Sequence, residues 1–266
     1  MIPNILSVAG SDSSGGAGIQ ADIKAISANG GYAMTAITAL TAQNTRGVQA
    51  VTLTSAGDVA AQIRAVREDI AIHAVKIGML GDAAIVRAVA EALAGLTCPI
   101  VLDPVMVAKS GDRLLHAEAA RLLRTALIPM ATVITPNLPE AADLLDEAEV
   151  TDRAGMLRQA RALLTLGPQA VLLKGGHLGG GDSPDLLLTA QEELWLEAPR
   201  LASRHTHGTG CTLSSALAAR MGAGVPLAAA VAGAKDYIRR AIAAADRLSV
   251  GGGCGPVNHF PKEMPQ

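Results

Sequence analysis

The segment from His205 to Ala219 places three small residues and a cysteine directly ahead of a helical pattern. It reads HTHGTGCTLSSALAA, and Gly208, Thr209 and Gly210 come where that helix should begin. The first turn of a helix has unpaired backbone N–H groups and the positive end of the helix dipole, so it can stabilise developing negative charge. Cys211 falls in the same turn, a position that lowers the pKa of a thiol. An ordinary capped helix with a buried, inert cysteine explains the same residues, so both interpretations stay open.

A second glycine-rich segment follows the first strand-like run of the chain. It reads AGSDSSGGAGIQAD from Ala9 to Asp22, and its four glycines allow the backbone to approach a ligand at the start of a helix. Neither the dinucleotide pattern G-x-G-x-x-G nor the phosphate-loop pattern G-x-x-x-x-G-K-[ST] occurs here or elsewhere in the chain. A glycine-rich turn with Ser13 or Ser14 as the helix cap is the alternative.

An aspartate and a glycine-containing loop follow a later strand-like run. Asp103 ends the run in VLDPVMVAKSGD, and a loop at residues 109–111 comes after it. An aspartate at a strand end can hold the water shell of a metal ion, and such a loop can close as a lid. A turn aspartate followed by a solvated loop is the alternative.

Three further strand ends present polar side chains, each with a structural explanation beside the functional one. Asn137 and Glu140 in TPNLPEA have the spacing of a helix capping box, which explains both without a ligand. Lys174 in LLKGGH is suited to offer a point charge to a phosphate, although a strand-end lysine at the surface is equally expected. Gln43 in TALTAQN has an amide that both donates and accepts, as the edge of a heterocycle requires, or that satisfies a neighbouring turn.

The hydrophobic pattern predicts a scaffold that brings these strand ends together. Short apolar runs alternate with helical stretches, which indicates an α/β fold of one domain over residues 1–266, with a mostly parallel central sheet covered by helices on both faces. We expect strands at residues 5–9, 35–40, 48–53, 74–77, 100–102, 132–135, 170–173, 185–189 and 194–197. We expect helices at residues 59–71, 83–94, 117–127, 153–166, 212–221 and 227–248. Ligands of such sheets bind beyond the carboxyl ends of the strands.

Composition argues against several classes of protein. Of the 266 residues, 50% are apolar and 17% charged, so the chain can bury a large core. Its 24 acidic and 22 basic residues form no block of like charge, which argues against nucleic acid or a membrane surface as a partner. Three cysteines without a CxxC pair argue against a disulfide framework or a zinc site, and we interpret His73, His116 and His259 as structural. Without a signal-peptide pattern or a membrane-length apolar run, we expect a cytoplasmic protein.

Taken together and in order, these segments resemble the ribokinase-like superfamily and, within it, the hydroxymethylpyrimidine/phosphomethylpyrimidine kinases of thiamine biosynthesis. The matching segments are AGSDSSGGAGIQADIKA, TALTAQNTRGVQ, KIGMLG, LDPVMVAKSGD, TPNLPEA, LLKGGH, HTHGTGCTLSSALAA and GPVNHF. The resemblance implies a ribokinase-like fold and ATP-dependent phosphorylation of 4-amino-5-hydroxymethyl-2-methylpyrimidine, first to its monophosphate and then to its diphosphate. We therefore expect ATP and Mg²⁺ as cofactors, a small-molecule pyrimidine substrate and a homodimer.

The resemblance also implies roles for the residues that match the family's motifs. Those expected to bind the pyrimidine or line its pocket are Gln43, Gly10, Asp22, Met79 and Val107. Those expected to form the anion hole are Gly208, Thr209, Gly210 and Cys211, the last at the position of the superfamily's catalytic aspartate. Those expected to face ATP are Lys174, Thr206 and Asn137, and those expected to organise Mg²⁺ and its waters are Asp103 and Glu140, together with Asn137.

Two alternatives to this function stay open. Some close relatives phosphorylate pyridoxal, and certain of those have a second cysteine in the lid, where this chain has Ala108; this residue and Gln43 favour the pyrimidine. A non-catalytic nucleotide or vitamin sensor is more remote, because no DNA-binding extension or basic patch would give it an output. The tail departs from the family at Cys254, where the relatives usually have histidine, and we expect this residue to lie away from the chemistry.

Overall fold

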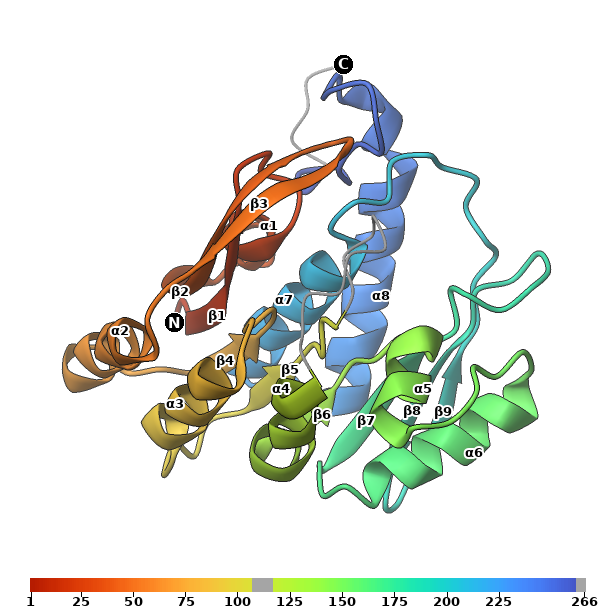
Figure 1. The fold of residues 1–266 in the computed structure, drawn as a ribbon. Helices are drawn as coiled ribbons and strands as arrows, with labels where there is room; N and C mark the ends of the chain where they lie inside the picture. Colours follow the sequence, from red (N-terminus) through yellow and green to blue (C-terminus); the bar gives the residue numbers. More distant parts are fainter. Residues whose placement is uncertain (107–116, 262–266) are drawn as a thin grey trace.

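The computed structural model describes residues 1–106 and 117–261, and its strands form one nine-stranded sheet (Figure 1). In chain order the strands are β1 (Asn4–Asp12), β2 (Tyr32–Asn44), β3 (Gly47–Leu53), β4 (Ala74–Ile77), β5 (Ile100–Leu102), β6 (Val133–Ile134), β7 (Ala170–Lys174), β8 (Asp185–Thr189) and β9 (Glu193–Leu196). Their order across the sheet is β3-β2-β1-β4-β5-β6-β7-β8-β9, parallel from β2 to β7 and antiparallel at both edges. The mostly parallel α/β sheet predicted from the sequence is confirmed.

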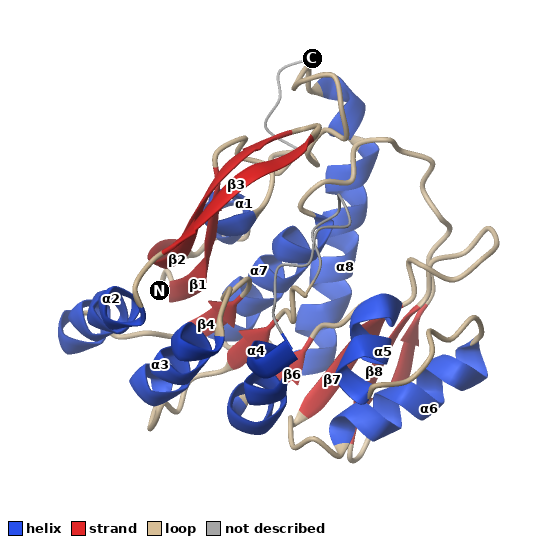
Figure 2. Cartoon of the chain, in the orientation of Figure 1, coloured by secondary structure: helices blue, strands red, loops and turns tan. Residues whose placement is uncertain are grey.

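Helices cover both faces of this sheet, as Figures 1 and 2 show. They are α1 (Gly18–Ala28), α2 (Ala56–Asp69), α3 (Ala83–Leu93), α4 (Ala117–Leu122), α5 (Leu138–Leu145), α6 (Arg153–Leu164), α7 (Thr209–Gly222) and α8 (Leu227–Ala243). Helices α2 to α6 build a core on one face, and α1, α7 and α8 build a second core on the other. Successive side chains of a strand point to opposite faces, so Leu6 and Val8 of β1 enter the first core and Ile5 enters the second. Within residues 1–106 and 117–261, no helix is long and apolar enough to cross a membrane.

The strand order positions a ligand site beside β1. The chain leaves β1 for β2 on one side and later returns to β4 on the other, so β1 marks the switch point of the sheet. Ligands of open α/β sheets bind at such a point, outside the carboxyl ends of the strands. Because the strands from β1 to β7 are parallel across this region, the segments that follow β1, β4, β5, β6 and β7 all leave from the same edge.

Several elements differ in extent from their predictions; β1, for example, is Asn4–Asp12 and α2 is Ala56–Asp69. Four of the other differences have a local reason. Strand β2 continues to Asn44 because its outer half pairs with β3 in an antiparallel hairpin. Helix α7 begins at Thr209 because Gly208 takes a left-handed backbone conformation that separates the helix from the preceding loop. Helix α8 ends at Ala243 and a short 3-10 turn follows, while α4 changes to a π-helical turn at Leu123.

Candidate active site

A cavity of about 830 Å³ opens at the switch-point edge of the sheet. Most of the residues that the sequence assigned to a site line it: Gly10, Gln43, Met79, Asp103, Asn137, Glu140, Lys174, Thr206, Gly208, Thr209, Gly210 and Cys211. Asp22 is not in its wall. Val107, Ala108 and the expected lid at 109–111 lie outside the described residues. The fold therefore gathers segments from both halves of the chain around one cavity.

The start of α7 meets the glycine-rich turn after β1 on one side and the ends of β5 and β7 on the other. Gly208 caps α7 with a φ of 78°, and a side chain there would clash with the carbonyl oxygen of Gly16. A Cβ atom on Gly210 would lie 3.2 Å from Oδ2 of Asp103 and 3.4 Å from Nζ of Lys174. Because both glycines lack a side chain, the positive end of the helix lies directly beside these polar groups.

Cys211 lines the cavity in the first turn of α7, but its thiol does not have the property that the sequence suggested. Burial raises the pKa of the Cys211 thiol to about 11 against the opposing effect of the Lys76 ammonium, and the charges of Asp22 and Asp103 raise it further. The prediction of a lowered pKa is therefore wrong, because it considered the helix start alone and not the buried, acidic surroundings. At pH 7 the thiol is neutral.

Two acidic side chains surround one lysine at the ends of β5 and β7. The Nζ atom of Lys174 lies 3.0 Å from Oδ1 of Asp103 and 4.0 Å from Oε2 of Glu140. Asp103 is buried and also accepts a hydrogen bond of 2.9 Å from the hydroxyl of Thr135. Burial raises the pKa of Glu140 to about 7, and the Asp103 charge raises it as well, while Lys174 opposes both. The cluster therefore holds more carboxylate than one ammonium group neutralises, which suits a site that binds a further cation.

Asn137 and Glu140 form the capping box that their spacing predicts. The side-chain oxygen of Asn137 accepts a hydrogen bond of 2.8 Å from the backbone N–H of Glu140, and the Glu140 carboxylate accepts one of 2.8 Å from the backbone N–H of Asn137. Both residues nevertheless line the cavity, and Glu140 faces Lys174. The structural explanation and a role in the site are thus compatible.

Asp22 does not line the pocket, contrary to the expectation from the resemblance. It is enclosed beneath the start of α7. Its side chain has no exposed surface and accepts hydrogen bonds of 2.6–2.9 Å from Ser7, Ser215 and Lys76. Burial lowers the pKa of Lys76, but the charge of the adjacent Asp22 carboxylate raises it more. The pKa of Lys76 therefore lies above its ordinary value. Both carboxylate oxygens are occupied, so Asp22 has no position left for a substrate.

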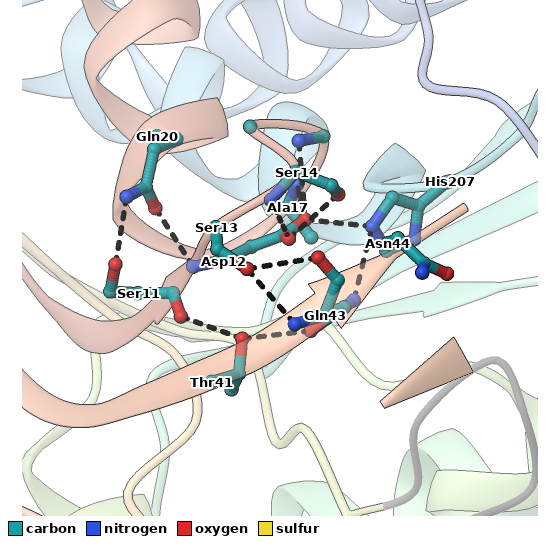
Figure 3. Close-up of polar contacts among 12 residues, drawn as sticks. Ser11, Asp12, Ser13, Ser14, Ala17, Gln20, Thr41, Gln43, Asn44 and His207 are labelled. Atoms are coloured by element: carbon teal, nitrogen blue, oxygen red, sulfur yellow. Dashed lines mark hydrogen bonds and ion pairs between the residues drawn. The ribbon is translucent and has the colours of Figure 1, made fainter. Parts of the chain in front are cut away.

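Gln43 lies at the end of β2 beside two residues to which the sequence analysis gave no role (Figure 3). The Nε2 atom of His207 is 2.8 Å from Oδ2 of Asp12 and 3.3 Å from Nε2 of Gln43. Burial alone raises the pKa of Asp12, but hydrogen bonds from His207, Ser14 and backbone N–H groups hold it well below its ordinary value. The places of these two residues in the sequence could have identified the pair, because Asp12 precedes the glycine-rich turn and His207 directly precedes Gly208.

The far end of the cavity is built by residues of β8 and α8 that the sequence analysis did not select. The Nζ atom of Lys235 lies 2.7 Å from Oδ2 of Asp185, whose other oxygen accepts a hydrogen bond of 3.0 Å from the backbone N–H of Gly175. Ile238 and Ile242 add apolar surface from α8. No local pattern identifies these residues, because their elements meet only through the fold.

Cys254 contacts one residue of the cavity wall. Its Sγ atom is 4.0 Å from Oγ1 of Thr206, which lines the cavity, and 3.3 Å from the carbonyl oxygen of Arg204. Cys254 itself is not in the cavity wall, and the expectation that it lies away from the chemistry stays a prediction.

Two of the three histidines interpreted as structural have structural partners. His73 accepts a hydrogen bond of 3.0 Å from the backbone N–H of Asn4. His259 is buried 3.1 Å from the hydroxyl of Thr212, and burial lowers its pKa to about 4. His116 lies outside the described residues.

Fold and site together define a phosphotransferase of the kinase class. Phosphoryl transfer depends on positioning and on neutralising phosphate charge, and this cavity combines a helix start, a lysine and two carboxylates. A family model described as "Phosphomethylpyrimidine kinase" matches residues 12–258. The chain belongs to this family, and the resemblance found in its sequence is confirmed.

Relatives and solved structures agree with this membership. The chain is 52% identical over 255 residues to the hydroxymethylpyrimidine/phosphomethylpyrimidine kinase of Rhizobium meliloti, covering 96% of each chain, and 52% identical over 258 residues to that of Escherichia coli, covering 97% of each. A phosphomethylpyrimidine kinase structure from Clostridium difficile matches with a TM-score of 0.80 and 43% identity, over 91% of this chain and all of the other. An ADP complex of Bacillus subtilis pyridoxal kinase matches with a TM-score of 0.88 and 34% identity, over 97% of this chain and 98% of the other.

Proposed function

We propose that this chain transfers the γ-phosphoryl group of ATP to the hydroxymethyl group of 4-amino-5-hydroxymethyl-2-methylpyrimidine, and then phosphorylates the monophosphate to the diphosphate, in thiamine biosynthesis. One observation carries the proposal: a single cavity contains an amide suited to a heterocycle, Gln43, and a helix start with a lysine suited to phosphates. His207 joins the two parts, because it contacts Gln43 and directly precedes Gly208. The names of the relatives support the same reaction. In this proposal, residues 1–266 act as one kinase domain.

The pyrimidine occupies the end of the cavity formed by β1, β2 and the loop after β4. Gln43 pairs with the ring nitrogen and the exocyclic amine, because one amide offers both a donor and an acceptor. Gly10 and Met79 complete this end, where a Cβ atom on Gly10 would lie 3.1 Å from Sδ of Met79. The missing side chain at Gly10 leaves the thioether of Met79 free to pack against a flat ring.

Phosphoryl transfer takes place at the start of α7. The backbone N–H groups of Gly208, Gly210 and Cys211 stabilise the charge that develops on the transferred group, while that of Thr209 donates to the carbonyl oxygen of Thr206. Lys174 adds a point charge beside them. Thr206 and Asn137 face ATP from the neighbouring loops. The apolar surface of Ile238 and Ile242 is suited to the adenine ring at the far end of the cavity.

Asp103 and Glu140 are the residues that would hold Mg²⁺. Within the described ranges, no three His, Cys, Asp or Glu side chains are grouped so as to bind a metal ion by themselves. Mg²⁺ does not need such a group, because it is usually bound by one or two carboxylates together with water and phosphate oxygens. The acidic excess around Lys174 fits this donor set. When bound, Mg²⁺ neutralises charge on the ATP phosphates.

A pyridoxal kinase is the second candidate, because several solved structures similar to this chain are pyridoxal kinases, with 30–34% identity. Pyridoxal offers a phenolic oxygen and an aldehyde, so it matches the donor and acceptor of Gln43 less well than an aminopyrimidine does. The relatives with 52% identity have the pyrimidine in their names. We therefore place pyridoxal second.

Parallel assays with Mg·ATP and each compound test the choice of substrate. We expect phosphorylation of hydroxymethylpyrimidine with the higher kcat/KM. Gln43→Met should lower this kcat/KM at least about tenfold, since an unmatched buried polar group costs roughly 1–3 kcal/mol, while pyridoxal turnover stays equal or rises. If wild type prefers pyridoxal, or if Gln43→Met keeps the original preference, the assignment of the pyrimidine is wrong.

A homodimer and a cytoplasmic location stay predictions. Light scattering of the purified protein and fractionation of cells that express it would test them.

A further inference from the structure

The neighbours of Gln43 allow only one orientation of its amide group to form complete hydrogen bonds (Figure 3). One end of the amide lies 3.3 Å from Nε2 of His207, and the other lies 3.1 Å from the hydroxyl of Thr41. The His207 Nε2 atom carries at most one hydrogen, and the Thr41 hydroxyl has one. The orientation of the amide therefore follows from where these two hydrogens are directed.

The hydrogen on His207 Nε2 is directed toward Asp12, 2.8 Å away. A carboxylate only accepts hydrogen bonds, so the ring nitrogen must donate. Asp12 is itself held by three backbone N–H groups of the glycine-rich turn at 2.8–3.1 Å. A nitrogen that donates to Asp12 cannot accept from the amide NH₂ of Gln43. The amide oxygen, and not the Nε2 atom placed there in Figure 3, therefore belongs at this contact, where it shares the same N–H group.

The Thr41 hydroxyl is compatible with the same orientation. It lies 2.9 Å from the carbonyl oxygen of Ser11 and 3.1 Å from the Gln43 amide, and when it donates its one hydrogen to Ser11 it acts toward Gln43 as an acceptor. An acceptor requires the amide NH₂ group opposite it. The two neighbours, one on the turn before α7 and one on β2, thus agree on how the amide lies.

The ring of His207 is fixed by packing as well as by Asp12. Its side chain is 13% exposed, and a Cβ atom on Gly16 would lie 2.5 Å from the ring and 3.1 Å from Pro256. Its backbone N–H donates to the carbonyl oxygen of Gly255 at 3.1 Å, and its own carbonyl oxygen accepts from Val257 at 3.3 Å. The C-terminal segment therefore holds His207 against the glycine-rich turn.

We infer that His207, held by Asp12, is a positioning residue that fixes the Gln43 amide with its oxygen toward His207 and its nitrogen toward Thr41. In this orientation one oxygen lone pair and one N–H group remain, side by side, for a ligand. The positions of the acceptor and the donor that a heterocycle meets are thereby fixed before it binds. An amide that is free to flip presents both arrangements of donor and acceptor, so it discriminates less between ligands. This inference rests on the proposed binding of the substrate by Gln43.

A double-mutant cycle between positions 207 and 43 tests the inference. His207→Leu removes the N–H donor, and we expect it to raise KM for the pyrimidine about tenfold, the size of one lost hydrogen bond, with kcat and KM for ATP within about twofold of wild type. His207→Gln places an N–H donor near the same point and should restore most of the affinity. In the Gln43→Met background, His207→Leu should have no further effect on KM, because the amide that it positions is gone.

Other outcomes of the cycle overturn the inference. If His207→Leu causes the same loss with and without Gln43, or if it lowers kcat and weakens ATP binding, His207 supports the start of α7 and does not position the amide. The cycle is measured with hydroxymethylpyrimidine and pyridoxal in parallel. A wild type that uses only pyridoxal contradicts the proposed function, while the coupling between the two positions, measured with pyridoxal, still decides this inference.

Discussion

Two lysine–aspartate pairs on the same sheet have nearly the same length but very different surroundings. The pair of Lys76 on β4 with Asp22 measures 2.9 Å, and the pair of Lys174 on β7 with Asp103 measures 3.0 Å. Both partners of the first pair have no exposed surface. Lys174 is 14% exposed, and it faces the cavity with Glu140 at 4.0 Å. Distance alone therefore does not tell a structural pair from a pair in a site.

The hydrogen-bond partners of each carboxylate show the difference. Asp22 accepts from Lys76, Ser7 and Ser215, so its charge is balanced and both its oxygens are used. Around Lys174 two carboxylates compete for one ammonium group, and burial, together with the Asp103 charge, raises the pKa of Glu140. Removing one partner of a balanced buried pair destabilises the fold, whereas an unbalanced cluster gains by binding a charged ligand.

The largest effect that this comparison predicts is on stability, at Lys76. Lys76→Met should lower the free energy of unfolding by roughly 3–5 kcal/mol, because it leaves the Asp22 carboxylate buried without its counter-charge. Urea unfolding measures this loss, which should also appear as low soluble yield. In the double variant Lys76→Met with Asp22→Asn, part of the stability should return, because the neutral amide removes the unpaired charge and still hydrogen-bonds Ser7 and Ser215. A single variant as stable as wild type would contradict the view that this pair is structural.

The next effect is on activity, at Lys174. Lys174→Met should lower kcat/KM for ATP by roughly 10²–10³, the range for removing one group that stabilises transition-state charge. The free energy of unfolding should fall by only about 1 kcal/mol, because the cavity admits water to Asp103 and Glu140 can take up a proton. Steady-state kinetics and urea unfolding of the same preparation measure both. A large loss of stability with normal use of ATP would place Lys174 with Lys76 as a structural residue.

The pairs also show what the sequence predicts well and what it does not. The strands β4, β5 and β8 have the predicted bounds, because each is a short apolar run that ends at a polar or turn residue. Periodicity and turn residues are local, and so is the capping box at Asn137 and Glu140. The motifs likewise indicated that Lys174 and Asp103 belong to one site, since both follow parallel strands.

Properties that depend on distant partners were predicted poorly. Nothing near Asp22 in the sequence shows that Lys76, 54 positions later, occupies its carboxylate, and the resemblance alone implies a place for Asp22 in the pocket wall. The contact of Asp12 with His207 spans 195 positions and was missed for the same reason. The helix start at Cys211 is visible in the sequence, but the burial that reverses its effect on the thiol is not.

The smallest predicted effect is at Cys211, which lies between the two pairs and responds to the charges of both. A thiol with a pKa of about 11 is almost entirely neutral from pH 7 to 9, so we expect that it does not act as the general base and that the rate has no pH slope from its ionisation. Cys211→Ala should therefore slow transfer to the alcohol and transfer to the monophosphate equally, each by less than about tenfold, since loss of a general base costs 10²–10⁴. Single-turnover rates of both steps measure this, with Cys211→Ser as the control that keeps a hydrogen-bond donor of similar size.

The attacking phosphate of the second step is already ionised near pH 7, as its second pKa is about 6. A loss of 10²–10⁴ confined to the alcohol step, together with a wild-type rate that rises about tenfold per pH unit, would show instead that the thiolate removes the proton and that Lys76 assists it through its charge.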